Sequence, residues 1–223
     1  MFYQVDVNPG PSIPRHHILV HADVMTDQAA LPDNALSRLL AALGSDGPRR
    51  GTPPVERWNP PYCGEIDMRI AADGSWHYMG TPIARPALVR LFSTVLRKDP
   101  DRYVLVTPVE RVGITVDDVP FLAVEMEVDG AGRDRRIAFR TNLDDVVWAG
   151  TDHPLRFETD RDGGVRPYVH VRGGLWARAT RTLALDLVGL GEEGEGQDEA
   201  TFGLWLAGTF VPIAAAPGLD RSP

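Results

Sequence analysis

The chain contains very little cysteine and very little lysine. Cys63 is the single cysteine in 223 residues, so no disulfide can form within the chain. Lys98 is the single lysine, which excludes a P-loop lysine and leaves almost no candidate for a Schiff base. Because an unpaired thiol is typical of a reducing compartment, we expect a cytoplasmic protein.

Long hydrophobic runs and positive charge are also scarce. No apolar run is long enough to cross a bilayer as a helix, and the N-terminus lacks the charged and apolar regions of a secretory signal. We therefore expect neither a transmembrane helix nor a signal peptide. The formal net charge is −8 and the pI is about 5.2. An acidic surface repels phosphate backbones and anionic lipids. We therefore expect neither a nucleic acid polymer nor a membrane as partner.

The motifs of several common catalytic and metal sites are missing. The chain has no G-x-S-x-G, no H-E-x-x-H, no paired C-x-x-C and no G-x-G-x-x-G or Walker A sequence. His16, His17, His21 and Asp23 stand close together, but no helical pattern gathers them on one face. The sequence therefore predicts no catalytic residue and no metal site, and the cofactor stays unknown.

The most informative stretch runs from Trp58 to Leu96. Alternating apolar residues over Ile66–Ile70 predict a strand with one buried face. Asp73-Gly74 is a hairpin-turn signal, and Trp76–Met79 reads as the answering strand. Apolar residues at helical spacing then predict an amphipathic helix over Leu88–Leu96.

A similar pattern returns after Pro154. The strands Leu155–Phe157 and Tyr168–Val171 flank a second turn signal, Asp162-Gly163. Leu175 lies 87 residues after Leu88, where the first predicted helix begins, so we predict that a second helix begins at Leu175. Two related β-hairpin-plus-helix halves imply an α+β fold built by internal duplication.

The rest of the chain sets the expected domain boundaries. Apolar spacing predicts a helix over 32–43, and further strands are expected at Tyr103–Val106, Val109–Val116, Phe121–Val128, Ile137–Phe139 and Phe202–Trp205. The acidic segment Gly191–Ala200 is predicted to be a solvated loop. We expect an arm, helix and linker over 1–57, a first half over 58–116, a second half over 117–213 and a tail over 214–223.

The motif W-x-P-x-x-C-G-x-I-D-M-x-I, followed by D-G-x-W-x-Y-x-G-x-P-I-x-R, resembles the signature of a bacterial family catalogued as a domain of unknown function. The likeness extends over roughly Trp58 to Phe210. It implies a duplicated core whose C-terminal half resembles a pleckstrin-homology fold, a partly closed barrel with a helix. It also implies a nucleotide-like ligand at the interface of the two halves and a role in signal transduction.

The residue types suggest how such a ligand would be held. Arg85 and Arg172 precede the two predicted helices and suit an anionic group, while aromatic rings suit a base. Polar side chains would orient the remaining edges. The candidate ligand-binding residues are Asp67, Arg69, Trp76, Tyr78, Arg85, Asn142, Tyr168 and Arg172.

Other interpretations of the same residues remain open. The two arginines can instead form structural ion pairs with Asp67, Glu110 or Asp145, with the aromatic residues in the core. A protein–protein adaptor without a small ligand is one alternative function, and it needs a protein partner. A hydrolase using Asp67 or Cys63 is the other. Of these readings, we expect a binding protein rather than an enzyme.

Overall fold

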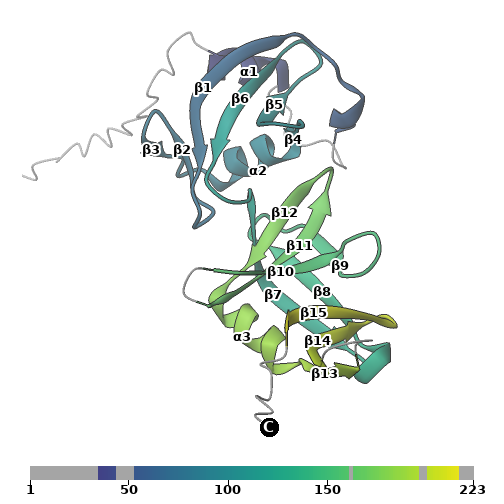
Figure 1. The fold of residues 1–223 in the computed structure, drawn as a ribbon. Coiled ribbons are helices and arrows are strands. Elements are labelled where there is room, and N and C mark those ends of the chain that lie inside the picture. The colour runs from purple at the N-terminus through teal and green to yellow at the C-terminus, as the bar shows by residue number, and fades with distance from the viewer. Residues whose placement is uncertain (1–34, 44–52, 161–162, 196–199, 216–223) are drawn as a thin grey trace, which may run out of the picture. The chain divides into compact units, whose positions relative to one another are not determined.

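The computed structural model describes residues 35–43, 53–160, 163–195 and 200–215 (Figure 1). The cluster His16, His17, His21 and Asp23 lies outside the described residues. Strands dominate the described part of the chain, and short helices accompany them. No helix within these ranges has the length and apolar character needed to span a membrane.

The first sheet consists of two antiparallel three-stranded meanders, with the strand order β3-β2-β1-β6-β5-β4. Its central strands, β1 and β6, pair in parallel. The helix α2 lies between the meanders in the chain. The bounds are α1 Ala35–Leu43, η1 Val55–Arg57, β1 Tyr62–Ile70, β2 Trp76–Tyr78, β3 Thr81–Pro82, α2 Pro86–Thr94, β4 Leu96–Lys98, β5 Tyr103–Val106 and β6 Arg111–Val116.

The second sheet is also built from two meanders, in the order β10-β11-β12-β7-β8-β9, and its central strands β12 and β7 are parallel. The helix α3 follows β12, and a small antiparallel sheet β13-β14-β15 completes the described chain. The bounds are β7 Phe121–Asp129, η2 Gly132–Asp134, β8 Arg136–Thr141, β9 Val146–Trp148, β10 Leu155–Thr159, β11 Val165–Arg172, β12 Leu175–Ala179, α3 Arg181–Gly189, β13 Glu192–Glu195, β14 Ala200–Leu206 and β15 Thr209–Ala215.

The two six-stranded sheets share one topology. If each set of six strands is numbered from its own start, both sheets have the order 3-2-1-6-5-4, with strands 1 and 6 parallel. The predicted duplication is therefore present in the structure. The helices are not equivalent, however, because α2 follows the third strand of its sheet and α3 follows the sixth.

The predicted second helix was placed too early. Leu175 begins strand β12, and α3 starts only at Arg181. Gly173 and Gly174 have φ values of 48° and 75°, a region that glycine enters freely, and they form the turn between β11 and β12. Burial then alternates along β12, as expected for a strand. The offset of 87 therefore aligns elements that are not equivalent.

The structure differs from the sequence prediction at two further places and confirms a third. The predicted helix over Leu88–Leu96 is α2, Pro86–Thr94, and Leu96 already belongs to β4. The acidic segment expected to be a loop contains β13, Glu192–Glu195, which pairs with β14. The hairpin at Asp73-Gly74 and the strands on either side of it are confirmed.

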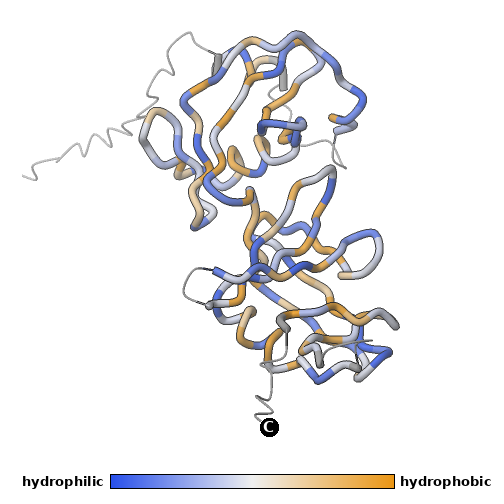
Figure 2. The backbone as a smooth tube through the Cα atoms, viewed as in Figure 1, coloured by the Kyte–Doolittle hydropathy of each residue, from blue (hydrophilic) through white to orange (hydrophobic). Residues whose placement is uncertain are grey.

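The first sheet buries one face against α2. Met68, Ile70 and Trp76 are at most 2% exposed, and the fully buried Phe92 of α2 packs on this face. The rings of Trp76 and Phe92 are stacked, with centroids 6.3 Å apart. Figure 2 shows hydrophobic and hydrophilic residues alternating along the strands of both large sheets, as expected for strands with one buried face.

The substitution Phe92→Ala is expected to lower the free energy of unfolding by about 3–5 kcal/mol, because it leaves a cavity beside Trp76. Urea unfolding followed by tryptophan fluorescence measures the change. Val109→Ala is the control, because Val109 is 66% exposed and its truncation should cost less than about 0.5 kcal/mol. Equal unfolding midpoints for the two variants would show that Phe92 does not carry this packing.

Candidate functional site

Within the described residues, no hydrogen bond or ion pair joins two of the predicted ligand-binding residues. Two of the three aromatic residues are buried: Trp76 is stacked on Phe92, and Tyr168 donates a hydrogen bond from its hydroxyl to Asp118, 3.2 Å away. Burial raises the pKa of the Tyr168 phenol. The half-buried Tyr78 packs against the core. Trp76 and Tyr168 therefore offer no open ring face for a base.

The three predicted arginines have different surroundings. Arg172 pairs with Asp145 at 2.9 Å and also donates to the carbonyl oxygen of Ser93 at 2.9 Å. Arg172 therefore forms the ion pair with Asp145 that the alternative interpretation expected. Arg69 forms a two-pronged pair with Asp117 at 2.6 and 2.8 Å. Arg85 is exposed at the N-cap of α2, where its side chain makes no hydrogen bond or ion pair with the described residues.

The two polar candidates are also separate. The side-chain Oδ1 of Asn142 accepts a hydrogen bond from the backbone N–H of Leu122 at 3.0 Å, and the backbone N–H of Asn142 donates to the Leu122 carbonyl at 2.8 Å. This amide clamp holds the β8–β9 turn to β7. Asp67 is exposed on β1, and its carboxylate has no hydrogen bond or ion pair within the described ranges. Within the described residues, neither forms a hydrogen bond or ion pair with another member of the predicted set.

The hydrolase residues do not form a nucleophile–base pair. Cys63 is exposed, and its Sγ lies 3.7 Å from the carbonyl oxygen of Pro61. His77 Nε2 lies 2.9 Å from Ser75 Oγ, and Ser75 also donates to Asp73 at 2.5 Å. The hydrogen bonds from the Ser75 hydroxyl and backbone N–H lower the pKa of Asp73 and lie within the β1–β2 turn. A carboxylate that contacts the hydroxyl instead of the imidazole does not orient a histidine as a general base.

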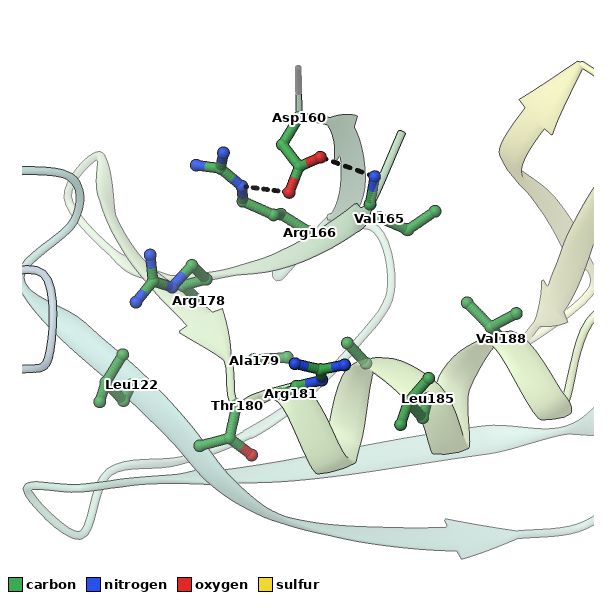
Figure 3. A pocket seen from close by; sticks show the side chains of 12 residues that line it. Leu122, Asp160, Val165, Arg166, Arg178, Ala179, Thr180, Arg181, Leu185 and Val188 are labelled. Atoms are coloured by element: carbon green, nitrogen blue, oxygen red, sulfur yellow. Dashed lines mark hydrogen bonds and ion pairs between the residues drawn. The ribbon is translucent and has the colours of Figure 1, made fainter. Parts of the chain in front are cut away.

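A cavity of about 780 Å³ lies in the second half, between α3, β12 and the β10–β11 hairpin (Figure 3). We call it the α3 cavity. Its volume is within the range of small-molecule sites. The lining residues are Leu122, Asp160, Gly164, Val165, Arg166, Arg178, Ala179, Thr180, Arg181, Ala184, Leu185 and Val188.

Three arginines and one carboxylate line the α3 cavity. Arg166 faces Asp160 at 3.5 Å, so its charge is largely compensated. Arg178 is half-buried and pairs with Asp118 at 2.9 Å. Arg181 is exposed at the first position of α3 and has no ion pair with the described residues. The lining carries a net positive charge, although the whole chain carries −8.

The start of α3 adds donors to the same end of the α3 cavity. Thr180 is the N-cap, and its side chain makes no capping hydrogen bond. The first backbone N–H groups of a helix have no partner within it, and they carry partial positive charge. Together with Arg178 and Arg181, these N–H groups favour an anionic group at this end.

Arg178 connects the α3 cavity to the first half of the chain. Its Nη2 donates to the carbonyl oxygen of Ala72, in the β1–β2 turn, at 2.6 Å. The same turn comes close to β7 through Gly74, where a Cβ would lie 3.1 Å from the Leu122 side chain. Gly74 has a φ of 80°, which favours glycine. Arg178 therefore lines the α3 cavity and also forms a hydrogen bond with the first half of the chain.

The sequence patterns did not point to this cavity, because α3 was expected six residues early. Once the helix is placed at Arg181–Gly189, the signal is clear: Arg181, Ala184, Leu185 and Val188 recur at helical spacing on one face. Among the described residues, no group of three or more His, Cys, Asp or Glu side chains is placed to hold a metal ion.

Comparisons with known proteins agree on one family. The model "Domain of unknown function (DUF1285), N-terminal domain" matches residues 53–119, and "Protein of unknown function (DUF1285), C-terminal domain" matches residues 120–213. The chain is similar to the crystal structure of a DUF1285 family protein from Silicibacter pomeroyi DSS-3, with 49% identity and a TM-score of 0.74 over 82% of this chain and 98% of that one.

A crystal structure of a DUF1285 family protein from Shewanella baltica OS155 is 26% identical, with a TM-score of 0.44 over 56% of this chain and 91% of that one. The search of curated proteins found no match.

Arg172→Ala is expected to destabilise the fold by about 1–2 kcal/mol, because it leaves Asp145 and the Ser93 carbonyl without their donor. Arg85→Ala is the matched control, since the Arg85 side chain has no described partner, and it should stay within about 0.5 kcal/mol of the parent. Urea unfolding at neutral pH compares the two. A larger loss for Arg85→Ala than for Arg172→Ala would contradict this assignment.

The Arg69–Asp117 pair predicts a pH dependence. The hydrogen bonds from Arg69 hold the pKa of Asp117 below its ordinary value of 3.8. A lowered folded-state pKa stabilises the fold above the ordinary pKa, and this contribution disappears as the pH falls through the folded-state value. Asp117→Asn should therefore lose less stability than the parent between about pH 5 and pH 2. Urea midpoints across this range test it, and identical pH profiles would rule it out.

Proposed function

The chain belongs to the DUF1285 family, and from that premise we propose that it binds a small anionic ligand in the α3 cavity and passes the bound state to a protein partner in signal transduction. The support is the net positive lining of the cavity on an otherwise acidic protein. Arginine forks and helix N-terminal N–H groups are the donors that proteins use for phosphate and carboxylate groups.

Arg178 is the observation on which the proposal mainly rests. A guanidinium has five N–H donors, and those of Arg178 serve Asp118 and the Ala72 carbonyl as well as facing the cavity. An anion that attracts Arg178 competes with the Ala72 carbonyl for the same guanidinium. Ligand binding is thereby coupled to the contact with the β1–β2 turn, which gives the two states that a signalling protein needs.

The family resemblance suggests two finer statements that we carry as hypotheses. One is a nucleotide-like ligand at the interface of the two halves, with Arg85 among its ligands. The other is a pleckstrin-homology-like second half, an idea supported by the way α3 packs on β7, β11 and β12 of a six-stranded sheet. The experiment below tests the first hypothesis, because a site at the interface and a site in the α3 cavity use different arginines.

A protein–protein adaptor is the second candidate function. The edge strand β9 exposes Val146 and Trp148, which are 61% and 42% exposed. An edge strand with outward apolar side chains accepts a further strand from a partner. Under this reading, small anions have no effect on stability, and Trp148→Ser abolishes capture of the partner.

The test is a thermal-shift screen with nucleoside phosphates, inorganic pyrophosphate and small carboxylates. A ligand at a hundred times its Kd should add about 2.7 kcal/mol of stability. Arg181→Ala should weaken binding about 10- to 100-fold, because charged hydrogen bonds are worth about 1.5–3 kcal/mol. Alanine suits a helix start, so the fold should persist.

Arg85→Ala is the control for the location. If Arg85→Ala abolishes the shift while Arg181→Ala keeps it, the site lies with the predicted interface residues and the α3 cavity is excluded. If no anion stabilises the parent protein, the ligand-binding proposal is wrong and the adaptor is favoured.

A further inference from the structure

We infer that the α3 cavity takes an amphipathic anion, with a carboxylate or phosphate head and an unbranched acyl tail, in preference to a nucleotide. The inference rests on the proposed anion site and adds the chemistry of the rest of the ligand. Its basis is the wall of the cavity beyond the arginines.

The helix α3 has two apolar stripes, although a surface helix normally has one. Leu183 and Leu187 are buried and form the first stripe. The second consists of Ala184, Leu185 and Val188, which line the α3 cavity. Leu185 is 65% exposed, whereas Val188 is partly buried against the core, so the sheet leaves the middle of this second stripe uncovered.

The side of the cavity opposite α3 contributes apolar side chains as well as Asp160, Arg166 and Arg178. Leu122, Val165 and Ala179 come from β7, β11 and β12 and face the same space. None of the twelve lining residues is aromatic, so a base would find no ring to stack on. Apolar side chains on both sides, without a stacking ring, suit a flexible hydrocarbon chain better than a purine or pyrimidine.

Along α3, the charged and apolar residues of the cavity follow one another from head to tail. Arg181 stands at the first position of α3, and Val188 follows two turns later, about 10 Å along the axis at 1.5 Å per residue. In Figure 3, Arg181, Leu185 and Val188 follow one another along α3, and the strand bearing Val165 and Arg166 runs above the helix. An anionic head at Arg181 and Arg178 therefore places a tail along Leu185 and Val188.

The experiment is isothermal titration of the full chain with hexanoate, octanoate and decanoate, each below its micelle concentration, and with AMP. Burying one methylene changes Kd about fourfold, so two should tighten binding about 15-fold until the cavity is filled. Decanoate should bind more tightly than AMP. Octyl phosphate should behave like decanoate, because the head is defined only as an anion.

Two variants separate the head from the tail. Arg181→Ala should weaken binding of all three carboxylates by a similar factor. Leu185→Ser should weaken decanoate binding several-fold and reduce the gain per methylene. Val109→Ser is the matched control, because Val109 is 66% exposed in the β5–β6 turn, away from the cavity lining, and its affinities should equal those of the parent.

The outcomes distinguish this inference from the proposed function. Tighter binding of AMP, with no effect of chain length, overturns the amphipathic ligand and keeps the anion site. A chain-length effect that Leu185→Ser does not change places the tail elsewhere and overturns it as well. Binding to phosphatidylglycerol vesicles without binding to free carboxylates also overturns it, and no binding of any anion overturns both proposals.

Discussion

The parallel pairing of the first and last strands is the constraint on which each half depends. In the first sheet, Arg69 of β1 lies opposite Thr115 of β6; in the second, Arg178 of β12 lies opposite Leu122 of β7. Each parallel pair joins two meanders that are separated along the chain. Such long-range pairing forms only after the intervening loop closes, so each sheet is complete only when its last strand arrives.

The same pairing creates the α3 cavity. The register of β12 against β7 sets Arg178 beside Leu122, and Thr180 then donates its N–H to the carbonyl of Ala123 at 3.1 Å. This hydrogen bond fixes where α3 starts, and with it the position of Arg181. Since Arg178 also reaches the Ala72 carbonyl, the strand pairing that closes the second sheet also ties it to the first half. The strand β12 therefore both completes the second sheet and carries the proposed signalling contact.

Local patterns gave much of the fold but little of the site. Alternation along Ile66–Ile70 and the Asp73-Gly74 turn predicted the first hairpin, because a strand period and a glycine turn are local properties. Gly173-Gly174 was overlooked as a turn, and the residues after it were taken for a helix. That single error hid α3. The predicted equivalence of Arg85 and Arg172, each directly before a helix, depended on the same incorrect offset.

The sequence alone determined the repeated strand pattern and the family, since local spacing and a long motif carry that information; the arginine-based anion site is our proposal. Only the tertiary structure decided which arginines share a cavity, because Arg166, Arg178 and Arg181 come from β11, β12 and α3. It also decided that Trp76 and Tyr168 are core residues and that Leu185 is exposed. Burial depends on what packs from distant parts of the chain, and no local pattern records it.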